Sequence, residues 1–335
     1  MAVVALALSA CREMPPQEDD IQVVQGEAQG STYTIKYRSD DDLRLAKTEV
    51  DSILDAIDMS LSTWKEGSTI SRFNREDTTV IEDAHFNHVF LWGREFSAIT
   101  QGAFQPMIAP LVRAWGFGPE GGQIDDGANL DSLRALVHFD FMVDSLEDGS
   151  FRYGKSPGMQ LDVNSYAQGY AVDVLVEYLE AKGIQHMMVE VGGELAARGH
   201  KAGGDGWRIG IDRPVEPGAV RELLAAVVLQ DAAMATSGTY RKYYEKDGKR
   251  YAHAIDPTTG RPVEHNLLSV TVMAPTAMEA DALATAFLVM GEGATLDFLE
   301  AHPDMEVEVY LISAEGEDDF RTYASTGWEE AVEEF

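Results

Sequence analysis

The sequence places a carboxylate and a hydroxyl where they could bind a metal ion together. In MEADALATAFLVMG, Asp281 and Thr285 lie four residues apart, so a helix would present both on one face. Such oxygen ligands suit Mg²⁺, which keeps its other coordination positions for water and phosphate oxygens. An aspartate near a helix start can instead act only as a cap that favours the helix dipole. The spacing alone leaves both interpretations open.

A histidine lies in a turn that precedes this segment. HAIDPTTGRP puts His253 close to Asp256, and Pro257 and Gly260 restrict the turn. An imidazole next to a carboxylate, and outside any apolar repeat, is a candidate general base because its pKa lies near neutrality. A structural role for His253 is the alternative.

The stretch 161–199 offers backbone groups as well as side chains. Asn164 and Ser165 are favourable N-cap residues, and the apolar residues after them recur at helical spacing. MMVEV then predicts a short buried strand that ends at Gly192-Gly193. Unpaired N–H groups at a helix N-terminus favour an anion such as phosphate. The other interpretation is an ordinary βα unit with a glycine-rich turn.

The elements that would position these residues follow from apolar periodicity. Alternation predicts a strand at 33–37, and helical spacing predicts helices at 50–61, 86–100, 130–137, 167–182 and 278–290. Further strands are expected in WRIGIDRP, LLAAVVLQD, AAMATSG and EVEVYLIS, with a hairpin turning at Asp247-Gly248. STWKEGSTISRFN and GAFQPMIAPLVRAWGFGP are expected to be loops, and 119–160 to be peripheral. The second loop suits either a flat ligand or structural packing.

Composition and charge exclude some classes of protein. The chain has 335 residues, of which 45% are hydrophobic, so it can bury a large core. A formal net charge of −31 argues against binding to nucleic acid or to anionic membrane surfaces. An anionic ligand would therefore need a local cation or a metal ion. No internal repeat or low-complexity linker interrupts the chain, which favours one compact α+β unit.

The N-terminal segment MAVVALALSACREMPPQEDD is typical of an exported lipoprotein. Residues 1–10 are expected to be the signal peptide, Cys11 to carry the lipid, residues 11–22 to form a tether and 23–335 to fold. Cys11 is the single cysteine, so an internal disulfide cannot form.

Eight segments in order along the chain together resemble the ApbE family of flavin transferases, which move FMN from FAD to a threonine of an acceptor protein. They are QGSTYTIKY, STWKEGSTISRFN, AFQPMIAPLVRAWGFGP, LDVNSYAQGYAVD, VEVGGELAARG, ATSGTYRKYY, HAIDPTTGRPV and MEADALATA. The resemblance implies a compact ApbE-like α+β fold, related to the T-fold, with mixed or antiparallel sheets and flanking helices. It also implies FAD as substrate, Mg²⁺ as cofactor and a lipoprotein of the inner (cell) membrane that faces the periplasm.

The same resemblance implies roles for individual residues. Mg²⁺ would be held by Asp281, Thr285 and an oxygen of Ser165, and His253 would take the proton of the acceptor threonine. FAD would be contacted by residues from many parts of the chain: Gln29, Ser71, Phe104, Gln105, Asp162, Gln168 and Ile255. Arg72 or Arg241 would add positive charge, with surface ion pairing as the alternative role.

Three positions depart from the family pattern, namely Gln29, Gln105 and Gln168. Glutamine can still hydrogen-bond adenine or ribose, but the loss of charge at two of these positions bears on affinity and nucleotide preference. Family acceptors resemble a Ser/Thr-Gly-Ala-Thr motif. This chain has Gly293-Ala294-Thr295 after Glu292, so the expected acceptor is a separate exported protein, a subunit of a redox complex.

Two other functions remain open from the sequence. If water replaced the threonine, the same site would be an FAD pyrophosphatase that releases FMN and AMP. An exported lipoprotein that binds FAD without chemistry is the third possibility.

Overall fold

The computed structural model describes residues 21–39, 43–118, 129–215, 220, 222–240, 243–246, 249–316 and 319–334. Cys11 and Arg241 lie outside these residues, as does the expected turn at Asp247-Gly248. The strands on either side of that turn, β11 (Tyr243–Lys246) and β12 (Lys249–Ala252), pair antiparallel, as the sequence predicts.

The central element is an eight-stranded sheet whose strand pairs are all antiparallel. In spatial order its strands are β1 (Gln22–Ala28), β2 (Ser31–Arg38), β6 (His186–Val191), β7 (Glu194–Arg198), β10 (Ala232–Gly238), β15 (Leu267–Ala274), β16 (Glu308–Ala314) and β17 (Phe320–Ala324). Four of these strands, β2, β6, β10 and β16, are predicted correctly from the sequence, whereas β1, β7, β15 and β17 are not predicted.

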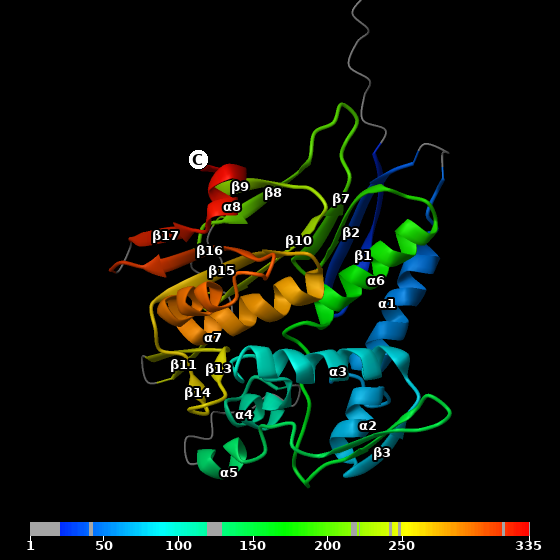
Figure 1. Cartoon of the computed structure of the whole chain (residues 1–335), viewed down its shortest axis with the longest axis vertical. Helices are drawn as coiled ribbons and strands as arrows, with labels where there is room; N and C mark the ends of the chain where they lie inside the picture. The colour runs from blue at the N-terminus through cyan, green and yellow to red at the C-terminus, as the bar shows by residue number, and fades with distance from the viewer. Residues whose placement is uncertain are drawn as a thin grey trace, which may run out of the picture.

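Side-chain alternation lets this sheet bury both of its faces. Helices α1 (Lys47–Leu61), α6 (Ala167–Ala181) and α7 (Ala277–Ala301) cover one face (Figure 1). The three strands β8 (Trp207–Asp212), β9 (Leu223–Leu229) and β18 (Val332–Glu334) cover the other with α8 (Thr326–Ala331). In β7, Ala196 belongs to the first core, whereas its neighbours Leu195 and Ala197 belong to the second.

Helix α7 is the core helix of this arrangement. It is long and apolar enough to span a membrane by composition, yet it packs against α6, β10 and β15 inside the protein. It continues beyond the predicted end, and Gly291 interrupts it with φ 77°.

The other half of the molecule holds α2 (Thr69–Arg75), α3 (Ala84–Ile99), η1 (Pro106–Ile108), α4 (Ala109–Ala114), α5 (Leu130–Arg134) and a sheet of β3 (Thr78–Ile81), β5 (Phe151–Gly154) and β4 (Met142–Ser145). The prediction that 119–160 is peripheral is wrong for β5, because Tyr153 is fully buried against Phe73, Phe86 and Phe90. The predicted loops around α2 and α4 are partly helical.

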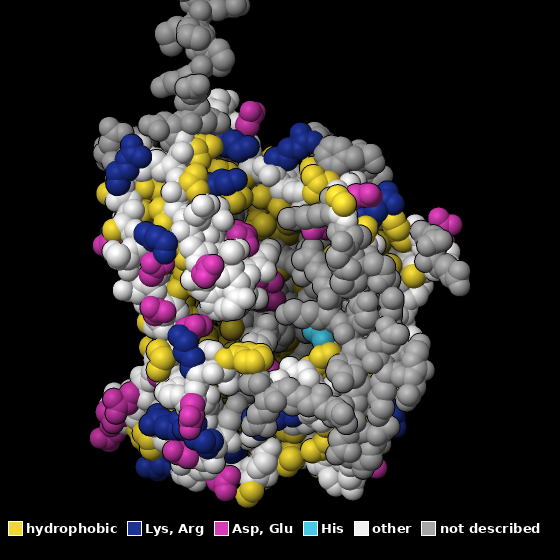
Figure 2. Space-filling view, turned by 180° about the vertical axis from the view of Figure 1, so that it is seen from behind, with side chains coloured by type: hydrophobic (Ala, Val, Ile, Leu, Met, Phe, Trp, Pro, Cys, Tyr) yellow, Lys and Arg dark blue, Asp and Glu magenta, His cyan; other side chains and the backbone are white. Residues whose placement is uncertain are grey.

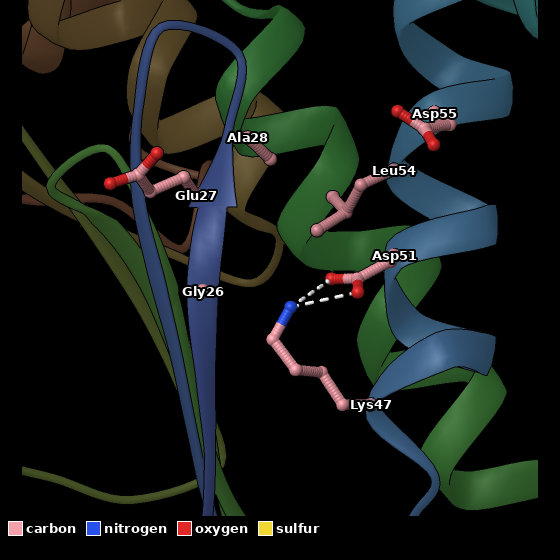
Figure 3. A pocket seen from close by; sticks show the side chains of 7 residues that line it. All are labelled: Gly26, Glu27, Ala28, Lys47, Asp51, Leu54 and Asp55. Atoms are coloured by element: carbon pink, nitrogen blue, oxygen red, sulfur yellow. Dashed lines mark hydrogen bonds and ion pairs between the residues drawn. The ribbon is translucent and has the colours of Figure 1, made fainter.

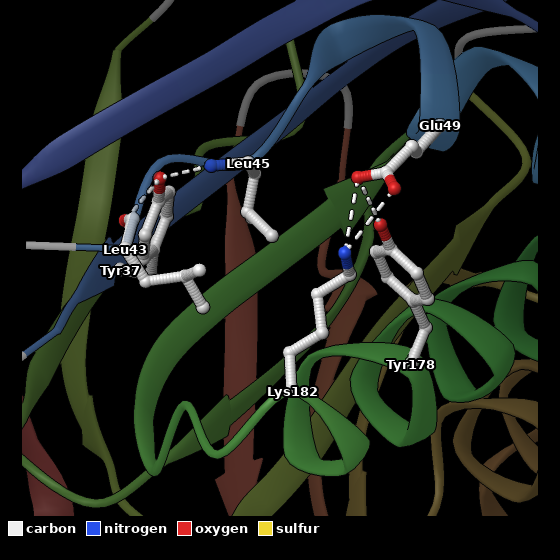
Figure 4. A network of polar contacts seen from close by, with 6 residues as sticks. All are labelled: Tyr37, Leu43, Leu45, Glu49, Tyr178 and Lys182. Atoms are coloured by element: carbon white, nitrogen blue, oxygen red, sulfur yellow. Dashed lines mark hydrogen bonds and ion pairs between the residues drawn. The ribbon is translucent and has the colours of Figure 1, made fainter. Parts of the chain in front are cut away.

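Polar contacts tie α1 to α6 and to the first hairpin (Figure 4). Glu49 accepts hydrogen bonds from the Tyr178 hydroxyl at 2.8 Å and from the Lys182 ammonium at 3.1 Å. The Tyr37 hydroxyl accepts the N–H of Leu45 at 2.8 Å. Exposed ion pairs of this kind contribute little to stability, so the buried apolar face of α1 determines its position.

Candidate functional site

Two turns and a strand end meet at one end of the central sheet. Gln29 and Gly30 form the β1–β2 turn with φ 53° and 71°, and Gly192-Gly193 form the β6–β7 turn. Because β2 and β6 are antiparallel, both turns lie at the same end, where the Gly192 N–H donates to the Thr32 carbonyl at 3.0 Å. The C-terminal end of β10 reaches this end too.

The N-terminus of α6 lies against the first turns of α7 at this place (Figure 1). The N–H of Gly169 donates to Asp281 Oδ2 at 3.1 Å. A Cβ on Gly169 would lie 2.2 Å from the Ala277 carbonyl oxygen, so only glycine allows this approach. The predicted caps Asn164 and Ser165 are wrong: Tyr166 is the N-cap, and it has no side-chain cap.

Asp281 is a buried carboxyl, only 5% exposed. Burial raises its pKa well above the usual range, and the nearby Glu194 and Asp173 carboxyls raise it further. The hydrogen bond from the Gly169 N–H opposes these effects and lowers the pKa. A buried acid in this setting favours a proton or a cation. Among the residues that the structure describes, its second oxygen has no hydrogen-bond donor.

Thr285 lies one turn after Asp281 on α7, as the spacing predicts. Its hydroxyl lies 3.2 Å from that of Ser237 at the end of β10. The position of Ser165, four residues before Gly169, brings it to the same helix terminus. The structure therefore brings Asp281 to the N-terminus of α6, which Ser165 precedes by two residues, and it places Thr285 one turn further along α7.

Two of the predicted FAD contacts also lie at this end of the sheet. The Gln168 amide packs directly against Gly192, where a Cβ would come within 2.0 Å of its nitrogen. Gln29 has a buried Oε1 atom that accepts no hydrogen bond within the described parts of the chain. A buried acceptor without a donor costs free energy, so a ligand N–H or hydroxyl would stabilise it.

Hydrogen bonds to the backbone of Leu161 and Asp162 fix the position of Asp162. Asn74 on α2 exchanges two hydrogen bonds with the backbone of Leu161, at 2.9 and 2.7 Å, and the Asp162 N–H donates to the Pro106 carbonyl at 2.7 Å. Burial raises the pKa of Asp162, while the Asn164 N–H and the charge of Arg113 lower it.

The side chains of Phe104 and Gln105 make contacts within the protein. Phe104 is 1% exposed and packs edge-on against Tyr166. Gln105 accepts the Met107 N–H at 3.1 Å and donates to the Ser97 hydroxyl at 3.3 Å. These contacts fix the backbone of the 104–106 segment, next to the carbonyl that holds Asp162.

His253 is half-buried between β12 and β13 (Ile255–Asp256), and its ring lies edge-on to Phe117 with centroids 6.5 Å apart. The carboxylate of Asp256 accepts the Thr258 N–H at 2.8 Å, so it stabilises the turn. Ile255 is buried against Leu111 and Trp115. The Trp115 indole N–H donates to the Gly260 carbonyl at 2.7 Å and joins the 104–118 segment to the histidine turn.

Ser71 and Arg72 lie on α2. The Ser71 N–H donates to the Ser68 hydroxyl at 3.2 Å, which caps the helix. Arg72 is exposed and donates to the Val80 carbonyl at 3.2 Å, a structural contact. Asn74, on the same helix, is the residue that reaches the Asp162 segment.

A cavity of about 440 Å³ opens between β1 and α1 (Figure 3). Gly26, Glu27 and Ala28 line one side, and Lys47, Asp51, Leu54 and Asp55 line the other. On the α1 side, Lys47 forms an ion pair with Asp51, one turn further along the same helix, at 2.7 Å. The lining ends one residue before Gln29, so this cavity adjoins the predicted site without containing its chemistry.

The surface charge is not gathered into one patch on the face shown in Figure 2, where Lys and Arg side chains lie among Asp and Glu. Within the described ranges, no group of three His, Cys, Asp or Glu side chains could hold a metal ion. A metal bound at Asp281 would therefore take hydroxyl, carbonyl or phosphate oxygens as its other ligands.

Sequence reasoning expected the neighbours of Ser71 in STISRFN, a segment that ends at Asn74, to line the flavin site, but it missed Glu194 and Ser237. Glu194 and Ser237 lie within the segments VEVGGELAARG and ATSGTYRKYY, but nothing in their local pattern shows that they approach α7. Only the strand order brings them there.

Comparison with known proteins gives consistent matches over most of the chain. A model of the ApbE family matches residues 29–311. The FAD:protein FMN transferase of Haemophilus influenzae is 36% identical, over 92% of this chain and 90% of that protein, and the one of Vibrio cholerae is 34% identical over 98% and 97%. The apo flavinyl transferase ApbE of Pseudomonas stutzeri superposes with a TM-score of 0.81 at 35% identity, covering 95% of this chain and 98% of that one. These matches confirm the predicted α+β fold.

Proposed function

Because the chain belongs to the ApbE family and is a flavin transferase, we propose that it moves FMN from FAD to a threonine hydroxyl of an exported acceptor protein and releases AMP. The observation that carries the proposal is the buried carboxylate of Asp281 at the N-terminus of α6. A helix N-terminus favours phosphate, and a buried carboxylate beside it favours a cation that can bridge to phosphate.

The residues present suit Mg²⁺ at this place. Asp281 and Thr285 supply a carboxylate and a hydroxyl on one face of α7, and Ser165 lies at the adjoining helix terminus. Bound there, Mg²⁺ would neutralise the pyrophosphate and favour in-line attack on it. The chain's own part is to hold these oxygens in a buried site, where the carboxylate meets no competing cation from the described side chains.

His253 is proposed as the general base. Its imidazole would take the proton of the acceptor hydroxyl as the threonine oxygen bonds to the phosphorus of the FMN half. The bond between that phosphorus and the bridging oxygen then breaks, and AMP leaves with the bridging oxygen. Packing against Phe117 keeps the ring partly out of water and restricts its orientation.

FAD would extend from this reaction centre along the end of the sheet. Gln29, Gln168 and Asp162 each offer a polar group to the nucleotide, and the Asn74 contacts keep Asp162 in place. The cavity between β1 and α1 would lie next to the Gln29 end of the ligand. Ser71, Phe104, Gln105 and Ile255 remain predicted contacts, the last three chiefly through backbone groups because their side chains are engaged.

The acceptor is proposed to be another protein. Thr295 is 0% exposed, and its hydroxyl donates to the Gly291 carbonyl at 2.8 Å. Glu292 is held by Arg321 at 2.6 Å. A threonine fixed in this way cannot reach a pyrophosphate without unfolding of α7, so the intact mass of the chain should not rise by one FMN after incubation with FAD and Mg²⁺.

The decisive experiment co-expresses the chain with an exported protein that carries a Ser/Thr-Gly-Ala-Thr motif. In-gel flavin fluorescence on the acceptor, together with AMP release, distinguishes transfer from hydrolysis and from FAD binding alone. His253→Ala should keep FAD binding but lower transfer by about 10²- to 10⁴-fold. A decrease of less than about tenfold would make His253 a structural residue.

We also propose that the protein is anchored on the outer face of the inner membrane, where such an acceptor would be a subunit of a redox complex. The N-terminal sequence that ends at Cys11 supports this location.

A further inference from the structure

Helices α6 and α7 each have a carboxylate that accepts backbone N–H groups from the first turn of the other helix. Asp173 on α6 accepts the N–H groups of Ala277 and Met278, the first two residues of α7, each at 2.8 Å. Asp281 on α7 accepts the N–H of Gly169 in the first turn of α6 at 3.1 Å. Each helix thus supplies an acceptor for N–H groups that the other cannot satisfy internally.

The two hydrogen bonds to Asp173 do more than cap the N-terminus of α7. That helix already has its own cap, since Thr276 accepts the N–H of Glu279 at 3.3 Å. Asp173 binds the two N–H groups before it, and it does so from a neighbouring helix. The bond therefore determines where the first turn of α7 lies relative to α6, as well as satisfying its donors.

The packing around this contact leaves little freedom. Gly169 lies so close to the Ala277 carbonyl that even a methyl group would overlap it. Two hydrogen bonds to one planar carboxylate restrict rotation of α7 about its own axis. Asp281 lies about one turn after Ala277, so its direction follows from the position of that first turn.

We propose that Asp173 is a positioning residue, which sets where Asp281 and Thr285 lie relative to the N-terminus of α6. The inference rests on the proposed metal site, and it extends that site to a residue that touches neither metal nor substrate. Groups that hydrogen-bond a metal ligand typically change metal affinity by about 10- to 100-fold when removed. Asp173 acts one step further out, through the backbone of α7, so we expect an effect near the lower end of that range.

The test compares Asp173→Ala with Thr276→Ala in the full-length chain. Both variants remove a cap from the same helix end, so both should lower the melting temperature. Asp173→Ala should also raise the Mg²⁺ concentration for half-maximal AMP release by about tenfold or more. It should further speed hydrogen exchange at the Gly169 amide in metal-free protein. Thr276→Ala should leave both quantities within about twofold of wild type.

Equal Mg²⁺ requirements in the two variants would overturn the inference and make Asp173 a cap only. If Asp173→Ala does not fold, Asp173→Asn keeps one acceptor oxygen and should give an intermediate shift. Asp281→Asn separates the two proposals: unchanged Mg²⁺ dependence in that variant would refute the metal site itself. The exchange rate of Gly169 in Asp173→Ala would still decide whether Asp173 positions α7, since it requires no metal.

Discussion

At the scale of single residues, Asp281 shows how a site can cost stability. Its carboxyl is buried next to Glu194, and both the burial and the neighbouring charge disfavour its charged form. The charged form nevertheless provides an anionic oxygen at a helix N-terminus. Groups held for catalysis are often poorly placed for stability, so their neutral replacements stabilise the fold.

We expect Asp281→Asn to separate these two effects. Asparagine has the same shape and can still accept the Gly169 N–H, but it carries no charge. AMP release should be abolished or nearly abolished, because the proposed metal ligand loses its charge. In metal-free buffer at pH 8 the variant should melt at a higher temperature than wild type, as scanning calorimetry with EDTA can measure. Retained Mg²⁺-dependent turnover would remove Asp281 from the metal site.

A second residue, Asp173, should make stability depend on pH. Burial raises its pKa from 3.8 to about 6, despite the two N–H groups that favour its charged form. The folded state therefore binds this proton more tightly than the unfolded chain does. Its stabilisation is present below pH 3.8 and is lost as the pH rises through about 6.

The expected size of this effect is about 3 kcal/mol at most, from roughly two pKa units. Asp173→Asn should remove the corresponding part of the pH dependence between pH 4 and 7, measured by urea unfolding of metal-free protein. Its loss of one hydrogen bond shifts stability equally at every pH, so only the difference in slope is diagnostic. Identical slopes in variant and wild type would show that Asp173 does not titrate in this range.

At the scale of elements, apolar periodicity predicts most helices, but not how they meet. The spacing of Val172, Leu175 and Val176 predicts α6, and all three are buried. Its start at Ala167 is predicted correctly, but the cap is not, because local rules expect Asn164 or Ser165 in that role. The donor at Gly169 is satisfied by a residue 112 positions away, which no local pattern can show.

The close approach of α6 and α7 can be tested with two glycines that both lie in helices. Gly169→Ala would place a methyl group against the Ala277 carbonyl and should cost about 1–3 kcal/mol of unfolding free energy. Gly293→Ala on α7 meets no atom within 4 Å and should stabilise by about 0.5–1 kcal/mol. Chemical denaturation measures both, and equal effects would mean that the helices do not pack as described.

At the scale of the whole molecule, the segments that resemble a family predict more than periodicity does. The proposed metal-binding face of α7 and the histidine turn are located by their motifs, and the structure brings Asp281 to the N-terminus of α6 and Thr285 to the end of β10. Glu194 and Ser237 could not be chosen in advance, because their approach to α7 depends on strand order and on helix packing. The small sheet around Tyr153 was missed because its strands are only four residues long, too short for a clear alternation.

The membrane anchor is the prediction that belongs to the whole chain. Cys11→Ser should shift the protein from the membrane fraction to the soluble or unprocessed fraction, because acylation is the anchor that the N-terminal sequence offers. Fractionation followed by immunoblotting measures this. Purified Cys11→Ser protein should release AMP at the wild-type rate, since Cys11 precedes residues 23–335, which are expected to fold. Membrane association that persists without Cys11 would indicate a different anchor.

The contacts between α6 and α7 also constrain when in its synthesis the protein can become active. The hydrogen bonds that join the two helices link residues 104 to 112 positions apart, and Trp115 binds Gly260 across 145. Closing such large loops is slow, and none of these contacts can form until the last third of the chain has emerged. If the chain is threaded through a membrane from its N-terminus, as we propose, it would therefore present the turns proposed to bind flavin and the first helix before it could use them. Nascent or truncated forms should be unable to consume FAD, so flavin outside the membrane would meet the transferase only after folding is nearly complete.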